Sequence, residues 1–263
     1  MSYTICPLFS GSEGNCTYIE DNGFSFLVDA GRSTKQIESL LMKNNLNTSI
    51  QFILVTHEHS DHTSALQVFC KRYKSKIYGS KGTIEALYKK GILVPTLNYE
   101  IIDLNGINND KVKIIPFDIP HDCAQGFGYS IFLKHSKIRI AICSDIGHIS
   151  ENIIKSISGA DIVFIESNHD LDMLKNGPYP YVLKRRILSE NGHLSNLECS
   201  NLIPKLVESG TSKIVLCHLS TNNNTPEIAY KCAMSSLEKY KSNKSIEIHI
   251  APKFNDNILK ISC

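Results

Sequence analysis

The segment Thr56-His57-Glu58-His59-Ser60-Asp61-His62 constrains this chain more than any other feature of its sequence. It ends a short apolar run with strand character, residues 52–56, and then places three imidazoles and two carboxylates within six residues. These side chains are the usual ligands of zinc and similar divalent ions. In an extended or turning backbone His57 and His59 point to the same side, which a helix would not allow, so an HExxH metalloprotease helix is excluded. The alternative, a solvated polar turn, leaves the density of ligands and the preceding strand unexplained.

Further ligands are expected downstream, because the four residues His57, His59, Asp61 and His62 cannot complete two metal sites. Three ligand-type side chains each follow an apolar segment that is expected to be a strand: His121, Asp145 and His218. Functional side chains in α/β proteins commonly lie on loops that a rigid sheet holds in place. A single histidine at a strand end is often only structural, so His121 and His218 become ligand candidates through the 57–62 segment.

The alternation of strands and helices predicts the fold class. Strands are expected at residues 3–9, 15–20, 24–29, 52–56, 76–78, 111–119, 129–134, 137–145, 161–166, 213–219 and 245–251. Helices are expected after capping-box patterns at Ser33 and Ser195, over residues 66–73 and 83–90, and after Thr225-Pro226. The chain has no internal repeat, low-complexity tract or linker, so residues 1–263 are expected to form a single α/β domain.

Composition limits the classes of function. The chain of 263 residues is 42% hydrophobic and 21% charged, which excludes a disordered or fibrous protein. A net charge of +2 argues against binding a polyanion by bulk charge, so any nucleic-acid binding requires a local basic patch.

The termini and cysteines indicate the compartment. No Lys or Arg precedes Arg32 and no apolar stretch is long enough to span a bilayer, so neither a secretory signal nor a membrane partner is expected. The nine cysteines contain no CxxC pair, which excludes a zinc knuckle or a thioredoxin motif. We therefore expect reduced thiols in a cytoplasmic protein.

The pattern HxHxDH, followed by His, Asp and His at strand ends, resembles the metallo-β-lactamase fold hydrolases along essentially the whole chain. The resemblance implies a four-layer αβ/βα sandwich of two mixed sheets flanked by helices. It also implies two divalent metal ions, with Zn favoured and Mn or Fe as alternatives. The positions that would bind the first ion are His57, His59 and His121.

The same resemblance assigns the remaining ligand positions. Asp61, His62 and His218 would bind the second ion, and Asp145 would bridge the pair. Asp29, at the end of an early strand, matches the structural aspartate of these hydrolases and would support the site from behind the ligands. All these positions are present without substitution.

Three further segments narrow the resemblance to the YycJ/WalJ group within this superfamily, whose implied activity is exonuclease action on DNA. They are Ser10-Gly11-Ser12-Glu13-Gly14-Asn15-Cys16, Glu166-Ser167-Asn168-His169-Asp170 and Gly192-His193-Leu194-Ser195-Asn196. The last is also similar to the Gly-His-Ser-Thr segment of tRNA 3′-processing endonucleases, in which the histidine assists departure of the leaving oxygen. The 73 positions from Asp145 to His218 are too few for the large cap domain of some nucleases of this fold.

The expected reaction is phosphodiester hydrolysis with DNA favoured over RNA as the substrate. Two ions roughly 3.5–4 Å apart would share a water and lower its pKa toward 7, so that a hydroxide attacks phosphorus. Asp61 and Asp145 would act by holding these ions, and His193 is the candidate proton donor to the leaving oxygen. The alternative is that His193 is only a surface residue that precedes a capped helix.

Other residues are candidates for substrate binding. Lys184-Arg185-Arg186 is the only dense basic cluster and could guide the nucleic-acid backbone, although such a run is commonly a solvated helix face. Ser195 and Asn196 open a helix whose free N–H groups could hold a phosphate. His169 could line the substrate groove or make a loop hydrogen bond. Tyr179 and Tyr181 could stack on bases or simply pack beside the neighbouring prolines.

Three cysteines lie close to expected ligands: Cys123, Cys143 and Cys217. Core filling is the favoured role, with oxidation sensitivity as the alternative.

Two alternatives to a nuclease remain open. A thioester or ester hydrolase would share the HxHxDH core but lack the Gly-His-Leu-Ser-Asn segment. A regulatory nucleic-acid-binding protein would carry a degraded site, yet no ligand position is missing here.

Overall fold

The structure is a computed structural model that describes residues 3–240, 246–256 and 259–262. The expected strand at 245–251 is therefore testable from residue 246 onward, and Ser245 lies outside the described residues. Cys263, one of the nine cysteines, also lies outside them.

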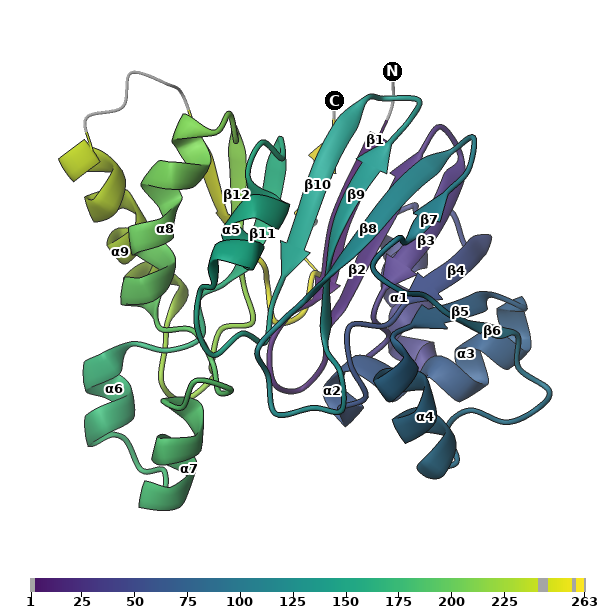
Figure 1. The fold of residues 1–263 in the computed structure, drawn as a ribbon, viewed down its shortest axis with the longest axis horizontal. Coiled ribbons are helices and arrows are strands. Elements are labelled where there is room, and N and C mark those ends of the chain that lie inside the picture. The colour runs from purple at the N-terminus through teal and green to yellow at the C-terminus, as the bar shows by residue number, and fades with distance from the viewer. Residues whose placement is uncertain (1–2, 241–245, 257–258, 263) are drawn as a thin grey trace.

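Within the described residues, two seven-stranded sheets form the centre of the protein (Figure 1). In spatial order the first contains β14 (Ile261–Ser262), β1 (Tyr3–Phe9), β2 (Cys16–Asp21), β3 (Phe24–Val28), β4 (Ile50–Leu54), β5 (Lys76–Gly79) and β6 (Tyr99–Ile101). The second contains β13 (Glu247–Ile250), β12 (Lys213–Cys217), β11 (Ile162–Glu166), β10 (Ile138–Cys143), β9 (Phe127–Leu133), β8 (Val112–Asp118) and β7 (Ile107–Asn108).

The two sheets share one pattern of strand pairing. In each, three antiparallel pairings are followed by three parallel pairings along the sheet. Strand β4 of the first sheet and strands β10 and β12 of the second all end at ligand-bearing loops. Parallel strands of one sheet deliver their carboxyl ends to the same edge, which brings the loops after β10 and β12 together.

Helices flank both sheets, and most of them cover an outer face (Figure 1). Those near the first sheet are α1 (Thr34–Lys43), α2 (Ser60–Thr63), α3 (Leu66–Tyr73) and α4 (Lys81–Lys89). Those near the second are α5 (Glu151–Ile157), α6 (Leu171–Asn176), α7 (Tyr181–Ile187), α8 (Asn196–Glu208) and α9 (Pro226–Tyr240).

Three apolar clusters hold these layers together. One lies between the sheets and joins side chains such as Phe26 of β3 and Phe164 of β11. Another packs α1 and α3 on the first sheet, and the third packs α8 and α9 on the second. The resulting order of helix, sheet, sheet and helix confirms the expected αβ/βα sandwich.

Local sequence signals explain several of the observed boundaries. Both capping boxes form, at Ser33 with Gln36 before α1 and at Ser195 with Glu198 before α8. The β2–β3 hairpin turns at Asn22 and Gly23, both at positive φ, as a two-residue connection requires. These features depend on residues a few positions apart, which is why the sequence predicts them.

The short elements, among them α5, α6, α7, β6 and β7, were not predicted from the sequence. The helices α6 and α7 have six and seven residues, and each buries a single side chain, Leu174 and Ile187. Such a helix is too short to show an amphipathic period. No helix among the described residues has both the length and the apolar character needed to cross a bilayer.

Candidate metal centre

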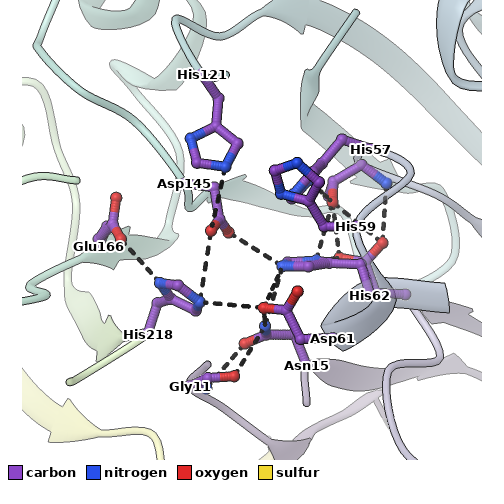
Figure 2. Close-up of polar contacts among 12 residues, drawn as sticks. Gly11, Asn15, His57, His59, Asp61, His62, His121, Asp145, Glu166 and His218 are labelled. Carbon is purple, nitrogen blue, oxygen red and sulfur yellow. Dashed lines mark hydrogen bonds and ion pairs between the residues drawn. The ribbon is translucent and has the colours of Figure 1, made fainter. Parts of the chain in front are cut away.

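The 57–62 segment turns directly after β4 and brings its imidazoles together. His59 precedes α2 with an extended backbone, at φ −67° and ψ 150°. As expected for extended residues two apart, His57 and His59 point to the same side, with 3.0 Å between His57 Nε2 and His59 Nδ1. His62 lies inside α2, and its ring points toward Asp145 (Figure 2).

The downstream candidates reach the same place from the second sheet. His121 follows β8, Asp145 follows β10 and His218 follows β12. Asp145 and His218 both adopt a left-handed backbone, at φ 56° and 55°. This conformation costs of order 1–3 kcal/mol for a residue other than glycine and is concentrated at functional sites. The turns direct both side chains toward α2.

All seven expected ligand residues meet in this cluster (Figure 2). Their ligand atoms form groups within 4.8 Å of one another: His57, His59 and His121; His57, His62 and Asp145; Asp61, His62 and His218; and Asp145, Glu166, His193 and His218. Asp145 belongs to two of these groups, and its carboxylate lies between the two sides. His62 Nε2 is 3.3 Å from Asp145 Oδ2, and His218 Nε2 is 3.4 Å from Asp145 Oδ1.

The histidines on the two sides of the cluster differ in charge, with His57 and His121 on one side and His218 on the other. Burial lowers the pKa of His57 well below its ordinary value and also lowers the pKa of His121. Both rings are therefore neutral, which is the form that binds a metal ion. Burial also opposes charge on His218, but Asp145 and the neighbouring carboxylates raise the pKa of His218 to about 10. The same carboxylates that keep a proton on His218 would also attract a divalent cation.

Two buried atoms test whether the cluster suits a metal. Asp145 Oδ2 and His218 Nε2 have ion-pair contacts, to His62 Nε2 and Asp145 Oδ1, but no hydrogen bond within the described ranges. A buried polar atom without a hydrogen bond costs about 1–3 kcal/mol, which coordination to a cation would offset. Imidazole nitrogens and carboxylate oxygens together suit Zn, Mn or Fe. The fold and this His/Asp cluster indicate divalent metal binding.

Asp29 stands behind the cluster, where the resemblance placed it. Its Oδ2 lies 2.7 Å from His62 Nδ1, and its Oδ1 accepts a hydrogen bond from Thr56 N at 2.8 Å. The contact fixes the orientation of the His62 ring so that Nε2 faces Asp145 and Asp61.

Asn15 is a positioning residue that the sequence analysis did not single out. Its Nδ2 lies 3.3 Å from Asp61 Oδ2, and its backbone N donates to the carbonyl of Asp61 at 2.7 Å. Gly31 makes this approach feasible, because a Cβ at that position would stand 1.6 Å from the Asp61 carbonyl oxygen. The segments 10–16 and 28–31 thus hold the loop that carries Asp61.

Glu166 belongs to one of the three segments that carry the resemblance to the YycJ/WalJ group, but no role was assigned to it from the sequence. It ends the buried strand β11 and is fully buried. Its Oε1 lies 2.8 Å from the Nδ1 atoms of both His193 and His218 (Figure 2 shows the contact with His218). Burial raises the cost of its charge, but these two imidazoles lower the pKa of Glu166 to about 2. A carboxylate at the end of a buried strand was the available signal, the same one that marked Asp145.

His193 lies at the edge of the metal cluster. Its Nδ1 is 3.8 Å from Asp145 Oδ1, and its side chain is 19% exposed. Burial disfavours its charge, but Glu166 raises the pKa of His193 above its ordinary value. Together with His218 it lines a cavity of about 160 Å³ that opens beside the cluster. The structure therefore brings the expected proton donor and one of the expected ligands, His218, to one cavity.

The basic run on α7 divides between two surfaces. Arg186 lines the cavity beside the metal cluster and forms an ion pair with Asp122. The Nζ of Lys184 donates to the carbonyls of Lys175 and Gly177, at 2.8 Å each. Arg185 is exposed, and its guanidinium lies 6.0 Å from the centre of the Tyr181 ring.

Three other substrate candidates, Ser195, Asn196 and His169, are buried. Ser195 caps α8, and the Asn196 side chain bonds to those of Ser167 and Asn224. His169 is 1% exposed, and neither ring nitrogen has a hydrogen-bond partner in the described part of the chain. These three residues lie behind the cavity wall rather than on it.

The cysteines near the ligands have raised thiol pKa values. Burial raises the pKa of Cys123 to about 12 and raises those of Cys143 and Cys217 well above the ordinary value. All eight cysteines among the described residues are free. The raised pKa values keep Cys123, Cys143 and Cys217 protonated at neutral pH, which favours core filling over reactivity.

Known proteins resemble this chain at the level of both sequence and fold. A family model described as the beta-lactamase superfamily domain matches residues 25–219. Exodeoxyribonuclease YycJ of Bacillus anthracis is 34% identical over 253 residues, which cover 95% of this chain and 95% of that protein. Exodeoxyribonuclease WalJ of Streptococcus pneumoniae is 35% identical over 234 residues, covering 88% and 86%.

A solved structure extends the likeness in fold. The metallo-beta-lactamase fold protein YhfI of Bacillus subtilis superimposes with a TM-score of 0.73 over 100% of both chains, at 16% sequence identity. This likeness concerns the fold and carries no information on the substrate.

Proposed function

Because the chain belongs to the metallo-β-lactamase superfamily and to the family of the YycJ and WalJ exodeoxyribonucleases, we propose that it is a dinuclear metal-dependent DNA exonuclease. One observation supports the nuclease assignment above the others. Glu166 holds His193 and His218 through the same oxygen, so a proton-carrying imidazole stands beside the ligand cluster. Both imidazoles face the cavity where a scissile phosphate would lie.

In this proposal the residues divide between two ions. His57, His59 and His121 would hold the first. Asp61, His62 and His218 would hold the second, and Asp145 would be shared between the two ions. Two divalent ions, with Zn favoured over Mn or Fe, would supply a water of lowered pKa and positive charge for the phosphate oxygens.

The remaining chemistry belongs to the chain itself. Cleavage of a phosphodiester leaves an alkoxide that needs a proton, and His193 is the residue placed to donate it. Glu166 orients the His193 ring through Nδ1 and stabilises its protonated form, so that Nε2 carries the proton to the leaving oxygen. Arg186, at the cavity wall, would pair with a backbone phosphate.

The substrate is proposed to be DNA rather than RNA, because both relatives named above are exodeoxyribonucleases. A cytoplasmic place of action, where chromosomal DNA is processed, is part of the same proposal. In this view the domain spans residues 1–263 without an inserted cap.

The test is a nuclease assay on end-labelled duplex and single-stranded DNA, with metal content measured in parallel. His193→Ala should lower kcat by about 10²–10⁴-fold, the usual contribution of a positioned general acid, while the protein keeps its metal ions. If His193→Ala cleaves DNA at the wild-type rate, His193 is not the proton donor. Intact DNA combined with rapid thioester hydrolysis would assign the protein to the thioesterases of this fold instead.

A further inference from the structure

The helical hairpin formed by α6, the loop 177–180 and α7, residues 171–188, is unusually apolar for an exposed element. It carries the two most exposed large hydrophobic side chains of the described chain, Tyr181 at 74% and Val182 at 79%. Leu171 and Leu188 are exposed as well. Figure 1 shows α6 and α7 projecting beyond the sandwich instead of covering a sheet. Packing therefore does not account for these side chains.

The hairpin also concentrates the positive charge of the protein. Four basic residues and one acidic residue give residues 171–188 a net charge of +3, whereas the whole chain carries +2. The exposed cations among them are Lys175, Arg185 and Arg186. A chain that is nearly neutral as a whole thus has one strongly basic projection, which attracts a polyanion locally.

An apolar groove runs between the two helices. It has a volume of about 400 Å³ and is lined by Leu171, Lys175, Tyr181, Lys184, Arg185 and Leu188. The Arg185 guanidinium lies above the Tyr181 ring, 6.0 Å from its centre. An aromatic ring and aliphatic side chains bordered by cations can receive a flat apolar group that carries negative charge on either side.

The opposite side of the hairpin belongs to the proposed active site. Tyr179, Leu183, Arg186 and Ile187 form one wall of the cavity that His193 and His218 also line. A ligand that occupies this cavity therefore contacts the hairpin, and an extended ligand can continue onto the outer groove. The two surfaces lie on one continuous element of 18 residues.

We propose that this hairpin binds unpaired nucleotides of the DNA strand whose scissile phosphate lies at the metal centre, an inference that rests on the proposed nuclease function. Proteins that hold single strands combine a basic track with aromatic side chains on which bases stack. A duplex presents its phosphates to such a surface while its bases remain stacked inside, so exposed apolar side chains gain little from it.

The charge of the hairpin argues against a second copy of this chain as the occupant. A symmetric dimer through this surface would place two patches of +3 against each other, and that repulsion opposes association. The apolar groove alone would suit many partners, but apolar and cationic side chains together select one with flat apolar groups and phosphates.

The test measures binding by fluorescence anisotropy with the metal-loaded full chain. The probes are a labelled single-stranded oligothymidylate of about 12 nucleotides and a blunt duplex of equal length, both with phosphorothioate linkages that resist cleavage. Tyr181→Ala should weaken binding of the single strand by about 5- to 150-fold, because stacking contributes about 1–3 kcal/mol per base. Tyr181→Phe should retain the affinity. Tyr230→Ala, which truncates an exposed tyrosine on α9, is the matched control.

Charge is tested separately with Arg185→Gln. The slope of log affinity against log salt concentration should decrease by about 0.7 for the single strand, the value for one lost phosphate contact. Unchanged single-strand affinity in both Tyr181→Ala and Arg185→Gln would overturn the inference. So would an equal loss for the blunt duplex, or a dimer that Tyr181→Ala disperses while DNA affinity stays the same.

The two proposals fail in different ways. If the wild-type protein cleaves no DNA under any metal condition, the nuclease function is refuted, whatever the hairpin variants do. If the wild type cleaves DNA and both hairpin variants bind single strands normally, only the role of the hairpin is refuted.

Discussion

The metal centre and the α6–α7 hairpin show two opposite ways of placing functional side chains. In the centre His57, His62, Asp145 and Glu166 are almost completely buried, and each contacts other members of the cluster. In the hairpin Tyr181 and Val182 are about three-quarters exposed. Burial preorganises the groups that need fixed geometry for chemistry. Exposure leaves the hairpin able to adapt to a flexible strand, at little cost to the stability of the fold.

The largest effect is expected for Asp145→Asn, which tests the buried metal centre in this comparison. The amide keeps the size of the side chain but removes the charge that lies between His62 and His218. We expect the rate of DNA cleavage to fall by about 1000-fold or more, because metal ions contribute several kcal/mol to such a transition state. Metal content per chain should fall as well.

The matched control is Asp110→Asn, an exposed aspartate between β7 and β8. It should leave both rate and metal content unchanged. Equal changes of rate and metal content in the two variants would contradict the role of Asp145 as a metal ligand.

The next largest effect is expected for Glu166→Gln. Glu166 Oε2 accepts hydrogen bonds from the backbone N of Ile146 and Leu194, while Oε1 contacts two imidazoles. A glutamine cannot satisfy all these partners, because its NH₂ group would face a donor on one side or the other. Loss of such a support costs typically about 10–100-fold in metal affinity or activity.

A positioning role predicts a particular kinetic signature for Glu166→Gln. The kcat should fall and its dependence on pH should change, whereas KM for DNA should change little. Glu85→Gln, at an exposed position of α4, is the control. A drop confined to KM would assign Glu166 to substrate binding and contradict its role behind His193.

Removal of the metal tests the centre through stability. Ions that bind only the folded chain stabilise it, by about 4 kcal/mol when their concentration is 1000 times Kd. Chelation should therefore lower Tm by roughly 10 °C for a protein of this size. Differential scanning calorimetry with and without chelator measures the shift, and restored metal should reverse it. A Tm that does not respond would show that the cluster is stable without ions.

The smallest effect is expected in the hairpin. Tyr181→Ala removes an exposed side chain and should change the free energy of unfolding by less than about 0.5 kcal/mol, which is less than about 2 °C in Tm. The contrasting control is Phe26→Ala, between the sheets, which should cost about 3–5 kcal/mol. A large loss of stability in Tyr181→Ala would mean that the hairpin contributes to folding and not only to binding.

Much of the fold could be predicted because its signals are local. The capping box at Ser33 needs only Gln36, three residues away, and the turn at Asn22 and Gly23 needs only its own backbone preferences. The ligand cluster was predictable for a related reason. His121, Asp145 and His218 each follow a strand, and strands that run in one direction in a sheet deliver their ends to one edge.

The amino-acid sequence by itself determined the strand ends, the ligand types and the helix caps of this protein. The tertiary structure alone decided which of these groups touch. Glu166 meets His193 across 27 positions and His218 across 52, and Arg186 meets Asp122 across 64. Such contacts depend on how two sheets pack, which no short pattern encodes. The same holds for α6 and α7, where so few side chains are buried that tertiary placement, rather than periodicity, gives them their position and their exposed apolar surface.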